Sequence, residues 1–216
     1  GIVTANRVLL PYLSRMFNSS ISEYGRIIKR VWRILVLVSL PVGMIIFINA
    51  EQIVNLLYGP IYQESIPVLQ ILSVALVIAI FRSVLEISFI AANKQTSYFY
   101  CMSGAAIIYT ITTYFGVQIS GIEGAAWAAL VSEFCYATLL LVYTSEVGKF
   151  AVTSTVLRSL FAACGSMLVL TAFHISSIVL NAISSIALYC LLLLLLREIS
   201  IQEIRSQIGK VLSPNL

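Results

Sequence analysis

Residues 66–92 read IPVLQILSVALVIAIFRSVLEISFIAA, a mainly apolar run whose two charged residues, Arg82 and Glu86, lie in its second half. The run exceeds the roughly 20 helical residues that cross a hydrocarbon core about 30 Å thick. It lacks the strict apolar–polar alternation of a strand in a membrane barrel. We therefore predict a membrane-spanning helix that carries two ionisable side chains within it.

The composition of the whole chain agrees with this prediction. Of its 216 residues, 60% are hydrophobic and 10% are charged, and the mean hydropathy is +0.99. A soluble domain carries about 25% charged residues. The net charge of +4 comes from cations in short loops, without a basic stripe interleaved with aromatic side chains. We expect membrane lipids around the protein and no nucleic-acid partner.

Further apolar runs have the length of full membrane spans. The predicted spans are Arg33–Ala50, Ile66–Ala92, Tyr98–Gln118, Gly121–Thr144, Val156–Phe173 and Ser176–Leu196. Gly1–Leu13 reads as the tail of a further, truncated span, so we expect the chain to be a fragment. Ser22–Trp32 and Ile199–Leu212 mix apolar and basic residues as surface-lying amphipathic helices do. The predicted fold is an all-α polytopic membrane helical bundle.

The Lys and Arg residues predict the orientation. Of these 13 residues, 12 fall on one side of the predicted membrane, before or at the edge of the first full span and in or beside alternate connections. The loop Glu51–Ser65 and the turn near Gly121 contain none. Short loops rich in Lys and Arg stay in the cytoplasm. We expect an even number of full crossings and a cytoplasmic C-terminus.

Signals for bond-making chemistry are weak. The chain has no Asp, and its four Cys residues are scattered singly through apolar segments, which gives neither metal-ligand spacing nor a disulfide framework. No nucleophile elbow or phosphate-binding loop occurs in the sequence. We therefore expect no enzyme activity, no metal and no cofactor.

Three ionisable residues are predicted at similar depth in the membrane. At 1.5 Å per residue, Arg82 lies on the order of 15 Å from the helix end near Ala92. Glu133 is about 12 residues from the opposite membrane face and reaches a similar depth. A charge near the bilayer centre costs roughly 2.5–3.5 kcal/mol on insertion scales and commonly marks function. We predict a shared polar interior of Arg82, Glu86 and Glu133, with a purely structural ion pair as the alternative.

Six short motifs follow one another along residues 10–142. They are Leu10-Pro-Tyr-Leu-Ser-Arg15, Leu40-Pro-Val-Gly43, Leu57-Tyr-Gly-Pro-Ile-Tyr62, Pro67-Val-Leu-Gln-Ile-Leu72, Asn93-Lys-Gln95 and Gly121-Ile-Glu-Gly-Ala-Ala126. In order and spacing the chain resembles the polysaccharide flippases, the Wzx-type O-antigen transporters of the multidrug, oligosaccharidyl-lipid and polysaccharide exporter superfamily.

The resemblance implies an organisation and a function. Residues 1–144 would form most of the C-terminal lobe of a two-lobed flippase, and residues 145–216 a trailing pair of spans with a cytoplasmic amphipathic tail. Such a protein moves a polyprenyl-pyrophosphate-linked oligosaccharide across the bacterial inner (plasma) membrane by alternating access. Its expected partners are this substrate, the missing N-terminal lobe and, as a candidate, the polysaccharide polymerase machinery.

Other functions remain open at this point. A drug or small-molecule exporter of the same superfamily is the nearest alternative. A membrane glycosyltransferase or polymerase would be expected to carry a large extramembrane loop with acidic or His residues, whereas the longest outer loop predicted here is Glu51–Ser65.

The resemblance also suggests roles for individual residues. Arg82, and more weakly Arg7, would bind the substrate, since the Arg donor fork matches the oxygens of a pyrophosphate. Glu86 and Glu133 would either form ion pairs with Arg82 or couple transport to the movement of an ion. Pro41 lacks a backbone donor and would kink the first full span beside Gly43, giving a hinge. The alternative is a Pro that is simply tolerated in a membrane helix.

Overall fold

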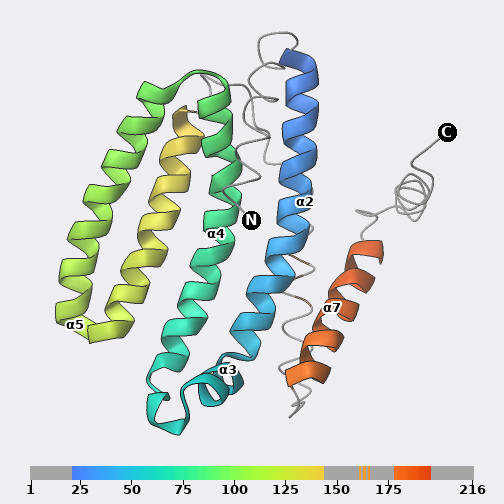
Figure 1. Ribbon diagram of the computed structural model, residues 1–216, viewed down its shortest axis with the longest axis vertical. Coiled ribbons are helices and arrows are strands. Elements are labelled where there is room, and N and C mark those ends of the chain that lie inside the picture. The colour runs from blue at the N-terminus through green and yellow to red at the C-terminus, as the bar shows by residue number, and fades with distance from the viewer. Residues whose placement is uncertain (1–20, 144–160, 162, 164, 166–177, 196–216) are drawn as a thin grey trace. The chain divides into compact units, whose positions relative to one another are not determined.

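A computed structural model describes residues 21–143, 161, 163, 165 and 178–195 (Figure 1). The chain divides into two compact units, Gly1–Ala151 and Val152–Leu216. Within the described residues the regular elements are all helical, and three of them, α2, α4 and α5, are long and apolar enough to cross a membrane. The predicted all-α membrane helical bundle is confirmed.

Helix α2 (Ile21–Ile48) opens the described part of the first unit. Its buried side chains recur every four residues and form one continuous stripe: Tyr24, Ile28, Trp32, Val36, Leu40 and Met44. The expected boundary between a surface helix over Ser22–Trp32 and a span from Arg33 does not occur. The basic residues lie on the other faces of the same helix, so they do not interrupt its packing stripe.

Pro41 and Gly43 both lie within α2, which continues as a helix through Pro41. A Cβ at Gly43 would overlap the Val77 side chain and lie 3.3 Å from the carbonyl oxygen of Ser73. The missing side chain therefore lets α2 approach α4 closely. Close packing against α4 therefore explains why a glycine occupies position 43. The hinge at Pro41 and Gly43 stays a prediction.

A short connection joins α2 to α4. Asn49 separates α2 from helix α3 (Ala50–Leu57), and its side-chain amide donates to the Ile45 carbonyl at 2.8 Å. Gly59, with φ of 84°, turns the chain into the 3-10 helix η1 (Pro60–Tyr62). A positive φ is a conformation that Gly adopts at no steric cost. Several large apolar side chains of this connection are exposed: Leu56, Leu57, Tyr58, Ile61 and Tyr62.

Helix α4 (Ser65–Ala91) matches the predicted second span within one residue at each end. It stops at Asn93, whose φ of 59° breaks the helix, while the Lys94 amide donates back to the Phe89 carbonyl at 2.9 Å. This left-handed residue with a backward hydrogen bond is a common helix terminus. The chain then turns at once into α5.

Helix α5 (Gln95–Tyr143) consists of two helical halves that meet at Ser120 and Gly121, which have non-helical backbone angles. These halves correspond to the predicted segments Tyr98–Gln118 and Gly121–Thr144, of which Thr144 lies outside the described residues. Beside the turn, the Gly116 and Gly124 backbones touch so closely that neither position has room for a Cβ. In Figure 1 the second half of α5 returns between the first half and α4.

The α4–α5 interface contains a hydrophobic core near the α4–α5 turn. Its buried members are Leu85, Phe89, Ala92, Cys101, Ala105, Tyr136 and Leu140, with Tyr98 and Leu139 packed against them. On the other side of α4, the Tyr24 hydroxyl donates to the Ser88 carbonyl at 3.4 Å. Helix α4 is thus fixed between α2 and the second half of α5.

Charge is distributed unevenly between the two ends of the first unit. The start of α2 and the α4–α5 turn lie at the same end in Figure 1. These two segments contain all the described cations of the unit other than Arg82: Arg26, Lys29, Arg30, Arg33 and Lys94. The opposite end, with α3, η1 and the turn at Gly121, carries no Lys or Arg among the described residues.

In the second unit, helix α7 (Ile178–Leu195) corresponds to the predicted last span Ser176–Leu196. The predicted segments Gly1–Leu13, with Arg7, and Ile199–Leu212 lie outside the described residues, as does most of Val156–Phe173.

Candidate functional site

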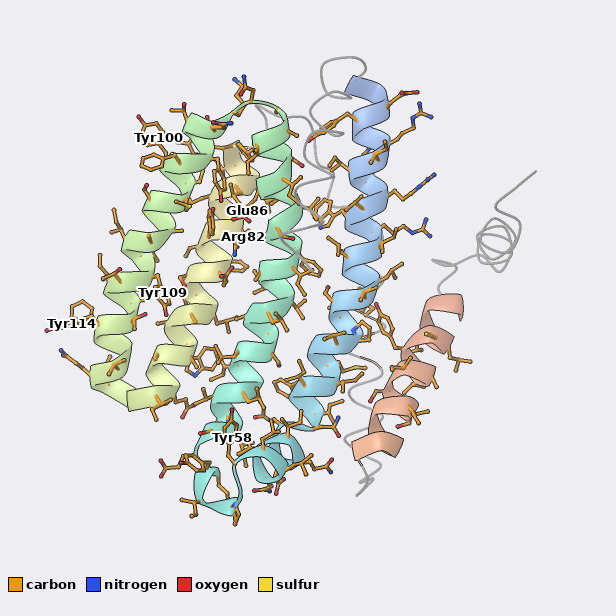
Figure 2. All side chains as sticks on the ribbon, viewed as in Figure 1. Tyr58, Arg82, Glu86, Tyr100, Tyr109 and Tyr114 are labelled. Atoms are coloured by element: carbon orange, nitrogen blue, oxygen red, sulfur yellow. The ribbon has the colours of Figure 1, made fainter. Side chains whose placement is uncertain are left out.

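Arg82 is the centre of an ionic cluster inside the first unit (Figure 2). Its Nε donates to Oε2 of Glu133 at 2.7 Å, and its Nη2 lies 3.4 Å from Oε1 of the same carboxylate. Nη1 donates to Oε1 of Glu86. The side chains of Arg82, Glu86 and Glu133 are only 16%, 22% and 28% exposed. The guanidinium is therefore held by two carboxylates at once.

Helix geometry explains why these three residues meet. Residues four apart lie on the same helix face, which places Glu86 one turn from Arg82. Glu133 comes from the second half of α5, which packs along α4 once the chain has reversed at Gly121. The turn at Gly121 thus brings the third member of the cluster to the first two.

Two tyrosines complete the surroundings of the cluster. The Arg82 guanidinium lies over the Tyr136 ring, with Cζ 4.4 Å from the ring centroid. A cation in this position is attracted by the electron-rich ring face. The Tyr98 hydroxyl donates to Oε1 of Glu86 at 3.5 Å. The buried Tyr136 hydroxyl has no well-formed hydrogen bond among the described residues, although Tyr98 and Glu86 surround it.

The cluster carries an excess of negative charge. One guanidinium and two carboxylates give formal charges of +1 and −2, hence a net charge of −1. Breaking such a buried group by removing one partner is costly, since it leaves a charge without its counterion. Arg82 is therefore the counterion on which both carboxylates depend.

A cavity of about 390 Å³ opens beside Arg82 and Glu133. Its walls come from α4 and from both halves of α5. The remaining lining residues are Met102, Ala105, Ala106, Tyr109, Ala129, Ser132 and Tyr136. Volumes of about 300 to 1,000 Å³ are typical of small-molecule sites. The charged cluster therefore faces an open space within the helices.

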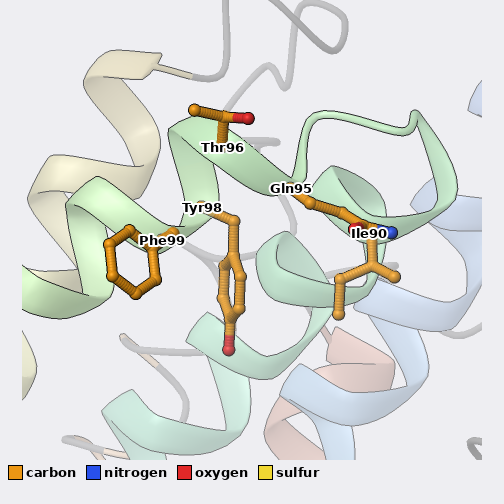
Figure 3. A pocket seen from close by; sticks show the side chains of 5 residues that line it. All are labelled: Ile90, Gln95, Thr96, Tyr98 and Phe99. Carbon is orange, nitrogen blue, oxygen red and sulfur yellow. The ribbon is translucent and has the colours of Figure 1, made fainter.

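A second cavity of about 510 Å³ lies at the α4–α5 turn and is lined by Ile90, Gln95, Thr96, Tyr98 and Phe99 (Figure 3). Figure 3 shows the Tyr98 ring extending away from its own helix, with the hydroxyl at the far end. That hydroxyl contacts Glu86, which in turn binds Arg82. A polar chain thus connects the walls of the two cavities.

The structure places the predicted site residues in different ways. It brings Arg82, Glu86 and Glu133 together, and their transport roles stay predictions. Pro41 and Gly43 lie on α2 and do not line either cavity. Arg7 lies outside the described residues.

Sequence reasoning missed the rest of the cavity wall, although a signal was present. Met102, Ala105, Ala106 and Tyr109 follow i, i+3, i+4, i+7 spacing, and Ala129, Ser132, Glu133 and Tyr136 repeat it. Such spacing marks one face of a helix. Comparing the two halves of α5 would have shown two similar faces, each ending in Tyr.

Together, the fold and the buried cluster define a polytopic α-helical membrane protein with an internal charged site. Residues 2–67 match the family model described as polysaccharide biosynthesis protein, which supports the resemblance to a polysaccharide flippase-type family. No curated protein matches the chain. The match indicates a role in polysaccharide biosynthesis or transport, and it ends before Arg82, so it assigns no function to the cluster.

Proposed function

We propose that this chain is part of a flippase that moves a polyprenyl-pyrophosphate-linked oligosaccharide across the bacterial plasma membrane by alternating access. The family match indicates the pathway, and the membrane-spanning helices indicate the place of action. Together they favour moving a polysaccharide precursor over synthesising it. The missing lobe and the polymerase machinery are proposed partners on the same basis.

The observation that carries the proposal is the Arg82–Glu133 pair at the wall of an open cavity between α4 and the two halves of α5. Ionisable residues within membrane helices are rare, and they commonly mark substrate or ion pathways. Here they face an open space between helices, where a polar head group can be accommodated. We propose Arg82 as a substrate contact, with Glu86 and Glu133 holding its guanidinium.

We further propose that the cation-rich end of the first unit faces the cytoplasm. Cytoplasmic loops retain Lys and Arg, because these residues resist translocation. The start of α2 and the α4–α5 turn would then be cytoplasmic, and α3, η1 and the Gly121 turn would face outward. The C-terminus would be cytoplasmic by the same alternation.

A gene deletion tests the proposed function. Cells without the gene should accumulate lipid-linked oligosaccharide in the cytoplasmic leaflet and lose surface polysaccharide, and a plasmid copy should reverse both effects. Purified full-length protein in liposomes should expose the head group to a membrane-impermeant lectin. Normal surface polysaccharide in the deletion strain would contradict the proposal. Increased drug sensitivity in that strain would instead favour the exporter alternative.

A further inference from the structure

We propose that the cavity beside Arg82 binds a sugar ring of the transported head group through its hydroxyls, and that the cavity is not the pyrophosphate site. This inference rests on the proposed flippase function and specifies which part of the substrate contacts α4 and α5. It departs from the expectation that Arg82 neutralises the pyrophosphate. Charge, surface chemistry and shape support it separately.

The charge of the cluster disfavours an anion. Arg82 already donates to two carboxylates, and the net charge of −1 would repel a pyrophosphate. Such repulsion is stronger in the low-dielectric interior than in water. A pyrophosphate could bind Arg82 only by displacing Glu133 or Glu86. An uncharged sugar requires no such exchange.

The polar groups of the wall suit hydroxyls. Glu133 accepts hydrogen bonds only, and sugar hydroxyls can donate to its remaining lone pairs. The three hydrogen bonds of Arg82 use three of its five N–H groups, so donors remain for sugar oxygens. The Ser132 hydroxyl donates to the Ala129 carbonyl at 2.9 Å and can still accept. The wall thus offers both donors and acceptors.

The apolar part of the wall suits a sugar ring. Tyr109 is 48% exposed and lines the cavity, so the wall includes an aromatic ring of the kind that packs against the C–H groups of a pyranose. Ala105, Ala106 and Ala129 have short side chains that leave the space open. The volume of about 390 Å³ has room for one sugar ring with water. A sugar ring between Tyr109 and the cluster would share this space with water.

Binding to the full-length protein in lipid nanodiscs tests the inference directly. The probes are the oligosaccharide released by mild acid from the cell's own lipid carrier, which lacks the pyrophosphate, and inorganic pyrophosphate. Saturation-transfer NMR reports contact of the oligosaccharide with the protein, and isothermal titration calorimetry reports binding of pyrophosphate, which has no carbon-bound protons to observe. We expect signals from sugar ring protons, and we expect pyrophosphate not to displace them.

Two variants locate the site. Ala106→Phe adds a large side chain to the cavity wall, replaces no member of the cluster, and should weaken oligosaccharide binding at least about tenfold, which corresponds to about 1.4 kcal/mol. Ile107→Phe is the matched control, because Ile107 is exposed and is not part of the lining. Tyr109→Ala should weaken binding while Tyr109→Phe retains it. This second series covers the case in which Ala106→Phe does not fold.

Two results would overturn the inference. In one, pyrophosphate binds and is lost in Ala106→Phe, which would make the cavity an anion site. In the other, oligosaccharide binding is absent, or it survives both Ala106→Phe and Tyr109→Ala. The liposome assay keeps the two proposals distinguishable. A wild-type protein that flips the intact lipid without sugar in this cavity refutes only the inference, whereas a protein that does not flip it refutes the proposed function.

Discussion

Arg82 and Glu133 are 51 positions apart in the sequence, yet they are joined through both oxygens of the carboxylate, at 2.7 Å and 3.4 Å. A fork-to-fork contact of this kind fixes the relative orientation of two side chains as well as their distance. It therefore links α4 to the second half of α5 at one defined register.

Removal of Arg82 should destabilise the protein more than loss of a single ion pair would. Arg82→Ala leaves two carboxylates facing each other without a counterion, and breaking a buried pair costs about 3–5 kcal/mol. Arg82→Lys should restore part of the loss, because it keeps the charge without the fork. Membrane abundance and the unfolding temperature in detergent measure the effect.

A charge-matched series separates structure from transport. The double change Arg82→Ala with Glu86→Ala should not restore abundance, because Glu133 remains unpaired. The triple change Arg82→Ala, Glu86→Gln and Glu133→Gln should restore it, since no charge is left in the cluster. A triple variant that is abundant and still exports polysaccharide would leave the cluster with a structural role alone.

Tyr136 should tolerate loss of its hydroxyl better than loss of its ring. Tyr136→Phe removes a buried hydroxyl without a well-formed hydrogen bond and keeps the ring under Arg82, so stability should stay the same or rise. Tyr136→Leu removes the cation–π contact and should cost about 0.5–2 kcal/mol. Equal unfolding temperatures for the two variants would contradict this assignment.

Two glycines of α2 should respond in opposite ways to the same substitution. Gly43→Ala drives a Cβ into Val77 and should destabilise the protein by about 1–3 kcal/mol. Gly25→Ala meets nothing within 4 Å and should stabilise the helix by roughly 0.5–1 kcal/mol. Thermal unfolding of the two variants side by side checks this. A neutral Gly43→Ala would show that α2 can move away from α4 and would favour the hinge.

The proposed orientation predicts opposite labelling at the two ends of α4. In a background without its own cysteines, Gln63→Cys should react with an impermeant maleimide added to intact cells, and Gln95→Cys should not. Both positions are exposed, so both should react after the cells are permeabilised. Labelling of Gln95→Cys alone in intact cells would reverse the orientation.

Parts of the fold that depend on length and hydropathy were predictable from the sequence. The second span and the break at Gly121 were found within a residue or two, because lipid requires a minimum apolar length and turns require Gly or Asn. The start of α2 was not found, since basic residues at the membrane edge resemble a surface helix unless the buried stripe from Tyr24 to Met44 is followed. Charged residues are visible in the sequence directly, whereas the buried face of a helix has to be inferred from residue spacing.

The candidate site was predictable only in part. Depth along each helix placed Arg82, Glu86 and Glu133 at one level, but depth says nothing of rotation about the helix axis. Tyr136 and Tyr109 could be assigned to the wall only when the faces of both α5 halves were known. That two carboxylates share one guanidinium likewise becomes clear only from the contacts that Arg82 makes with Glu86 and Glu133.

The turn between the two halves of α5 also constrains how the protein enters the membrane. Only Ser120 and Gly121 leave the helical path, and the Gly116 and Gly124 backbones are already in contact beside them. There is no hydrophilic loop that could emerge first and hold one half in place while the other is still being synthesised. We therefore expect the two halves of α5 to insert into lipid together as one helical hairpin, with Glu133 carried in the second half.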